Sequence, residues 1–114
     1  MTISIVTGGA GFIGSHIVEK LRQLEHMVVV IDNEYSDNDN FTWRKDTLNV
    51  NLDITDYKGL KKAFTGADYI FHCAAEARIG PAIENPVNAL NINTIGTCNV
   101  LQCAREVGAK KVLY

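Results

Sequence analysis

The segment Thr7-Gly8-Gly9-Ala10-Gly11-Phe12-Ile13-Gly14 decides the fold of this chain. It directly follows an apolar run at residues 3–6 and leads into a helical pattern, and its glycines read as GxGxxG from Gly9 or as GxxGxxG from Gly8. In such a strand-to-helix turn the backbone can approach a pyrophosphate without a Cβ in the way, and the helix N-terminus offers N–H groups to the phosphates. Glycines also collect in turns that bind nothing, so the motif needs support from its surroundings.

That support comes from Asp32, which closes a second apolar run at residues 27–31. An acidic residue about 20 positions beyond the glycine loop can accept hydrogen bonds from both hydroxyls of an adenosine ribose, and it repels a 2′-phosphate. The next residues, Asn33 and Glu34, carry no positive charge that would hold such a phosphate. The sequence therefore predicts binding of NAD rather than NADP.

Short apolar runs alternate with helical patterns along the rest of the chain. We expect strands at residues 2–7, 27–31, 47–52, 67–73 and 111–114, helices at 12–25 and 85–107, and a short helix capped by Thr55 or Asp56 that ends near Phe64. The expected apolar face of the first helix consists of Ile13, Ile17, Leu21 and Leu24. Residues 33–46 form a polar surface loop, with five polar residues in succession at 36–40.

Alternation of this kind, with right-handed crossovers, predicts an α/β fold. We expect a Rossmann-type doubly wound parallel sheet of about five strands in the order 3-2-1-4-5. Residues 1–114 are interpreted as one dinucleotide-binding domain that is incomplete, without later strands or a substrate domain.

Composition excludes several other classes. The chain has 11 Lys and Arg residues against 13 Asp and Glu residues, a net charge of -2, which gives no basic surface for nucleic acid. No apolar run approaches the roughly 20 residues that span a bilayer, and no signal-peptide pattern opens the chain. We therefore expect a cytoplasmic protein with neither a nucleic-acid nor a membrane partner.

The three cysteines, Cys73, Cys98 and Cys103, form no metal-ligand pattern. We interpret all three as small buried apolar residues, since free cysteines are usually buried. The three histidines are interpreted as packing or hydrogen-bonding residues, so no catalytic or metal site is assigned to them.

Three further segments match one known family. They are Asp53-Ile54, His72-Cys73-Ala74-Ala75, and Pro86 with Asn93-Thr94-Ile95-Gly96-Thr97. Together with the glycine loop and Asp32, they cover most of the chain. The chain resembles the extended short-chain dehydrogenase/reductase family, and in particular its NAD-dependent nucleotide-sugar epimerases and dehydratases.

The resemblance implies a set of NAD-binding residues. The backbone of Phe12 and Ile13 would cover the pyrophosphate, Asn33 would assist Asp32 at the ribose, and Asp53-Ile54 would meet the adenine. The small residues after the fourth strand would line the channel to the nicotinamide, beside a structural, cofactor-side asparagine. The full set is Gly8, Gly11, Phe12, Ile13, Gly14, Asp32, Asn33, Asp53, Ile54, Ala74, Ala75, Ala77 and Asn93.

The resemblance also implies that the catalytic residues lie elsewhere. In this family a Ser or Thr and a Tyr-x-x-x-Lys pair follow the fifth strand, beyond Tyr114, so no catalytic residue is assigned here. The pair Tyr57 and Lys61 has the right spacing, but it is expected on the adenine side, out of reach of a substrate. Glu76 and Arg78 point toward the substrate side by the same resemblance, or form a solvated loop pair.

Three functions remain open at this point. The first is the NAD-binding portion of a nucleotide-sugar 4-epimerase, in which NAD takes a hydride from the sugar and returns it. The others are a portion of a nucleotide-sugar 4,6-dehydratase and a non-catalytic dinucleotide sensor. For the enzymes, the family implies a nucleotide-sugar substrate, held mainly by a C-terminal domain, and a homodimer. We expect these 114 residues alone to bind NAD without catalysis.

Overall fold

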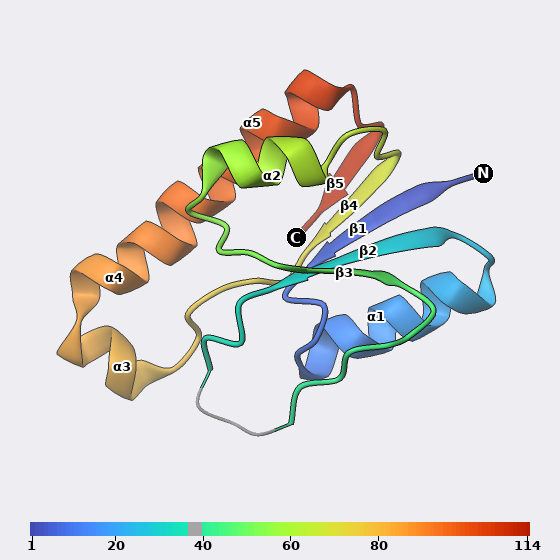
Figure 1. Ribbon diagram of the computed structural model, residues 1–114. Helices are drawn as coiled ribbons and strands as arrows, with labels where there is room; N and C mark the ends of the chain where they lie inside the picture. Colours follow the sequence, from blue (N-terminus) through green and yellow to red (C-terminus); the bar gives the residue numbers. More distant parts are fainter. Residues whose placement is uncertain (37–39) are drawn as a thin grey trace.

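Five parallel strands form one sheet in the order β3-β2-β1-β4-β5 (Figure 1). The computed structural model describes residues 1–36 and 40–114. The strands are β1 (Ile3–Thr7), β2 (Met27–Asp32), β3 (Leu48–Asn51), β4 (Tyr69–His72) and β5 (Lys111–Leu113). The predicted sheet and its strand order are confirmed, and every strand end lies within two residues of the expected one.

The central strands are buried on both faces because apolar side chains occupy successive positions. Since neighbouring residues of a strand point to opposite faces, each face has its own core. Four residues, Ile5, Val29, Ile31 and Ile70, belong to one core, and Val6, Val28 and Val30 belong to the other. The two cores explain the unbroken apolar runs that predicted a parallel sheet with two covered faces.

Helices cover the two faces unequally (Figure 1). The helices are α1 (Phe12–Gln23), α2 (Tyr57–Ala63), α3 (Ile79–Glu84), α4 (Pro86–Leu90), the π-helical η1 (Asn91–Gly96) and α5 (Thr97–Val107). Val18 and Leu21 of α1 pack on one core, and residues of α2 and α5 pack on the other. Asp56 caps α2 by accepting a hydrogen bond from the Gly59 N–H, and left-handed Gly108 ends α5.

The buried face of α1 agrees with the predicted one at Leu21, which is buried, and at Ile17, which packs against the core, but differs from it elsewhere. Gly14, Val18 and Leu21 are the buried residues of this helix, whereas Ile13 and Leu24 are exposed. The reason is the contact between Gly14 and the Gly8 carbonyl, which leaves no space for a Cβ at Gly14. This close contact turns Gly14, and not Ile13, toward the sheet.

Two further expectations need correction. The predicted helix at 85–107 is present without a gap from Pro86 to Val107, but its middle part, η1, is π-helical, and there Gly96 lies against the Ile54 side chain with no space for a Cβ. The short helix α3 was not predicted, because none of its residues is buried and its pattern is therefore not periodic.

The expected loop residues at 37–39 lie outside the described part of the chain. Within that part, no helix is long and apolar enough to cross a membrane.

One side-chain network ties β1, β4 and α5 together below the glycine turn. Thr7 Oγ1 accepts the backbone N–H groups of Cys73 and Ala74, at 3.1 and 3.2 Å, so its own hydrogen is left for His72 Nδ1 at 2.7 Å. The proton of the neutral ring is then on Nε2, which donates to Thr97 Oγ1 at 2.9 Å. Burial lowers the pKa of His72 from its ordinary value of 6.5, in keeping with a neutral ring.

This network predicts a loss of stability in mild acid. Because the pKa of His72 is lower in the folded chain, the unfolded chain takes up a proton first as the pH falls below 6.5. The contribution is fully present above that pH and is lost as the pH falls through the folded pKa. Urea unfolding between about pH 5 and 8 should show this decrease, and His72→Gln should flatten it. An equal pH dependence in the two proteins would contradict the assignment.

Candidate functional site

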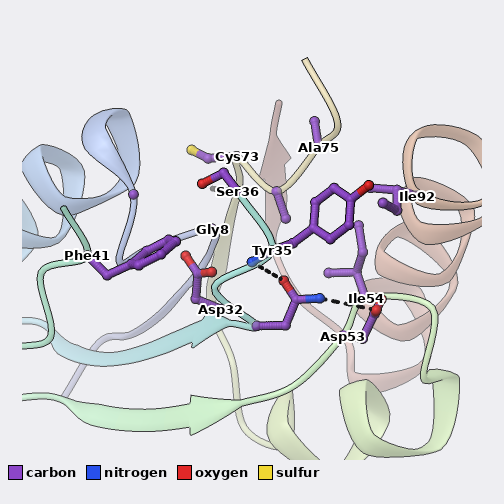
Figure 2. Close-up of a pocket in the computed structure, with 13 residues that line it drawn as sticks. Gly8, Asp32, Tyr35, Ser36, Phe41, Asp53, Ile54, Cys73, Ala75 and Ile92 are labelled. Atoms are coloured by element: carbon purple, nitrogen blue, oxygen red, sulfur yellow. Dashed lines mark hydrogen bonds between the residues drawn. The ribbon is translucent and has the colours of Figure 1, made fainter. Parts of the chain in front are cut away.

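A pocket lies where the carboxyl ends of β1, β2, β3 and β4 meet (Figure 2). The strand order reverses between β1 and β4, and ligands of open α/β sheets bind at such a switch point. The pocket brings together eight of the residues predicted from the sequence. They are Gly8, Gly11, Asp32, Asn33, Asp53, Ile54, Ala74 and Ala75.

The end of β2 aims the Asp32 carboxylate into this pocket. Oδ1 accepts the Glu34 N–H at 2.8 Å, and Oδ2 accepts the Ala10 N–H at 3.1 Å. Each oxygen has two lone pairs, so each keeps one for a further donor. The two backbone bonds fix the side chain in place and still leave it able to accept two hydroxyl groups.

The neighbouring acid, Asp53, is oriented from both sides. Asn33 Nδ2 donates to its Oδ2 at 3.2 Å, and the N–H and hydroxyl of Thr55 donate to its Oδ1 at 2.9 and 2.8 Å. Ile54 beside it is buried and packs against Gly96. This corner of the pocket therefore offers one polar wall and one apolar wall.

The glycines of the turn have different physical roles. Gly8 has a left-handed φ of 66°, and a Cβ there would come within 2.8 Å of the Ala74 nitrogen. A Cβ at Gly9 would lie 2.7 Å from Val30 Cγ1, so the fold itself excludes side chains at both positions. At Gly11 a Cβ would meet only the Gly8 oxygen, at 3.4 Å. Packing does not require glycine at Gly11, which lines the pocket.

The first turn of α1 presents backbone N–H groups at the same edge. Gly11 is the N-cap and has no side chain to bond them, and the first turn contains no acidic residue. The leading N–H groups of a helix have no intrahelical partner, and they attract anions. Phe12, Ile13 and Gly14 belong to this turn, although none of the three lines the pocket.

Asn93 and Ala77 also lie outside the pocket lining. Asn93 braces the loop after β4, since its Oδ1 accepts the Glu76 N–H at 2.8 Å and its Nδ2 donates to the Glu76 carbonyl at 2.9 Å. Glu76 and Arg78 do pair, as one interpretation of the sequence expected, but Glu76 is not solvated. Glu76 is 5% exposed and forms a two-pronged ion pair with Arg78, because the braced loop turns its side chain inward.

Sequence reasoning missed several residues that line the pocket. They are Tyr35, Ser36, Phe41, Cys73 and Ile92. Figure 2 shows Asp32 flanked by Phe41 and Tyr35. One sequence signal could have indicated Tyr35 and Phe41, because both are aromatic residues in an otherwise polar loop. An apolar side chain outside any helix or strand pattern has no core position of its own and is a candidate for packing against a ligand.

The prediction that the cysteines are buried is correct for Cys103 but wrong for Cys98, which is exposed on α5. Cys73 is half-buried in the pocket wall, and burial raises the pKa of its thiol. A thiol with a raised pKa is mostly protonated at neutral pH, so Cys73 is a weak nucleophile.

Tyr57 and Lys61 do not line the pocket, and both side chains bond to a residue of α5. The Tyr57 hydroxyl donates to the Glu106 carboxylate of α5, and Lys61 Nζ lies 3.2 Å from the same carboxylate. The hydrogen bond to Glu106 raises the pKa of Tyr57 to about 12. A tyrosine that acts as a proton acceptor near neutral pH needs a lowered pKa, so this pair is unsuited to acid–base catalysis.

Known protein families and structures were found that resemble this chain over nearly its whole length. The profile of the NAD dependent epimerase/dehydratase family matches residues 4–114. A putative UDP-glucose 4-epimerase of Methanocaldococcus jannaschii is 40% identical over 112 residues, which cover 96% of this chain and 36% of that protein. UDP-glucuronic acid decarboxylase 1 of Danio rerio is 36% identical over 114 residues, covering 96% of this chain and 26% of that protein.

Solved structures agree with the sequence matches. The UDP-glucose 4-epimerase of Thermotoga maritima, determined with UDP-glucose, superposes with a TM-score of 0.90 at 33% identity. The Thermus thermophilus UDP-glucose 4-epimerase in complex with NAD gives a TM-score of 0.86 at 34% identity. Each match covers 97% of this chain and 36% of the solved chain.

The chain thus spans about a quarter to just over a third of the length of these relatives. The match nevertheless extends over almost all of its residues, including the glycine turn and the pocket edge. The chain belongs to the NAD-dependent epimerase/dehydratase family.

Proposed function

We propose that these residues form the NAD-binding portion of an enzyme that acts on a nucleotide sugar. The observation that carries the proposal is the Asp32 carboxylate, held by two backbone N–H groups in the pocket with one lone pair free on each oxygen. The uncapped first turn of α1 lies at the same edge and suits a pyrophosphate. One relative of this fold is an epimerase solved in complex with NAD.

The same geometry favours NAD over NADP. Two ribose hydroxyls can donate to Asp32, whereas a 2′-phosphate would face a fixed carboxylate. Asp53 also lines the pocket, and it is acidic as well. No Lys or Arg is among the residues that line the described pocket.

Bound NAD would supply a hydride acceptor for a sugar hydroxyl carbon. The residues of this chain would hold the adenosine and pyrophosphate, and Ala74 and Ala75 would leave space beside the end of β4 for the rest of the cofactor. A 4-epimerase is the leading assignment, since relatives by sequence and by structure carry that name. A nucleotide-sugar decarboxylase is the second candidate, because other relatives are named so.

The proposal assigns binding, and no catalytic step, to residues 1–114. In the described part of the chain, the one Tyr-x-x-x-Lys pair is bonded to Glu106, away from the pocket. General acid–base help is typically worth about 10²–10⁴-fold in rate, so a polypeptide of these residues should bind NAD without turning over a sugar.

The Asp32→Asn variant tests cofactor choice. Loss of the negative charge should weaken NAD binding by about tenfold or more, since hydrogen bonds to a charged acceptor are the strong ones, and should narrow the preference over NADP. Calorimetric titration with both cofactors measures this. Glu34→Gln is the matched control, because it also removes a negative charge near Asp32. The Glu34 carboxylate accepts a hydrogen bond from Trp43, and Glu34 does not line the pocket. Equal affinity of the wild type for NAD and NADP would contradict the assignment.

The Gly11→Ala variant tests whether the turn serves a ligand. The added Cβ finds ordinary space in the free chain, so the melting temperature should stay close to the wild-type value. NAD affinity should fall by about tenfold or more, because the methyl group enters the path of the pyrophosphate. Gly80→Ala is the control, since a Cβ there meets nothing within 4 Å. Unchanged affinity in Gly11→Ala would mean that the glycines form only a turn.

A further inference from the structure

Two loops border the pocket on opposite sides of the switch point. The loop after β2 supplies Tyr35 and Ser36, and the loop after β4 supplies Cys73, Ala74 and Ala75. A dinucleotide that lies along the crevice passes between these two loops. A contact that joins them therefore spans the crevice in which the cofactor would lie.

Tyr35 makes such contacts. The Arg78 guanidinium, from the loop after β4, lies over its ring at 5.3 Å from the centroid. Asn88 Nδ2, from α4, donates to the Tyr35 hydroxyl at 2.7 Å. We call Tyr35, Arg78 and Asn88 the clasp.

The Arg78 side of the clasp is rigid. Its Nε lies 3.1 Å from Glu76 Oε1 and its second guanidinium nitrogen 3.0 Å from Oε2, and the Arg78 N–H also donates to Oε1 at 3.1 Å. Glu76 is buried, and Asn93 holds its backbone with two hydrogen bonds. The contacts that opening must break are those of the Tyr35 side chain, namely its ring contact with Arg78 and its hydroxyl bond to Asn88.

The pocket beside the clasp is small. Its cavity volume is about 140 Å³. Pockets for drug-sized ligands usually measure about 300–1,000 Å³, and a dinucleotide is larger than most such ligands. Tyr35 lines this pocket (Figure 2), and its hydroxyl accepts the hydrogen bond from Asn88 of α4.

We propose that the clasp is a kinetic gate on the cofactor site, which must open both when NAD enters and when it leaves. This inference rests on the proposed function. A gate that closes over both the free and the occupied pocket slows association and dissociation together. A residue that only contacts the cofactor would change dissociation alone.

The test compares cofactor binding rates in Tyr35→Phe and in the wild-type full chain. The phenylalanine ring stays over Arg78, and only the hydroxyl bonded to Asn88 is lost. Stopped-flow mixing with NADH, followed by energy transfer from the single tryptophan, Trp43, gives both rate constants. Both the association and the dissociation rate constant should rise by about three- to tenfold, which corresponds to the usual free energy of one hydrogen bond. Their ratio, the dissociation constant, should change far less.

Two further variants distinguish an effect of the Tyr35–Asn88 hydrogen bond from a general destabilisation of the fold. Asn88→Ala removes the same hydrogen bond from α4, so the double variant with Tyr35→Phe should be no faster than either single one. Tyr69→Phe makes the same chemical change at the start of β4, at the other end of the sheet, where the ring stacks on His26, and it should leave both rates unchanged.

The outcomes are distinct. An unchanged association rate in Tyr35→Phe, in a protein that binds NADH, would overturn the gate and leave the proposed function standing. A wild-type chain that does not bind NADH at all would overturn the proposed function and the gate with it.

Discussion

The backbone of Gly8 touches two other segments at once, and the cofactor pocket depends on both contacts. Its carbonyl lies against Gly14 of α1, and its Cα lies against the backbone at Cys73 and Ala74. No side chain fits on either side, so the end of β1, the start of α1 and the end of β4 meet at backbone distance. The floor of the crevice is therefore peptide backbone, which a phosphate or a flat ring can approach closely.

The other parts of the pocket follow from this contact. Thr7 receives the N–H groups of Cys73 and Ala74, and it passes a hydrogen bond through His72 to α5. With α1 fixed in rotation, the Ala10 N–H faces Asp32 and holds its carboxylate toward the crevice. A local requirement for two glycines thus sets the position of an acid that lies on the next strand.

The sequence predicted those parts of the molecule whose signals are local. Apolar runs marked the strands, the left-handed Gly108 marked a helix end, and the glycine spacing with Asp32 located the pocket edge. The rotation of α1, the π-helical turn and the burial of Glu76 were not predictable in the same way. Each is decided by a contact between separate elements and not by the pattern within one element: Gly8 with Gly14 of α1, Ile54 with Gly96, and Asn93 with the loop after β4. The pocket-lining role of Tyr35 also depends on the distant Asn88.

The central claim is that a dinucleotide lies across the carboxyl edge of this sheet, on the turn that Gly8 fixes. The most direct measurement is an NMR titration of the isotope-labelled chain with NAD, with amide signals assigned. The account predicts that the largest shifts fall on Gly11, Phe12 and Glu34, whose N–H groups face the pyrophosphate or share Asp32 with the ribose. Signals at the opposite edge, such as those of Asp68 and Lys110, should stay in place. Shifts confined to that opposite edge, or no shifts at saturating NAD, would contradict it.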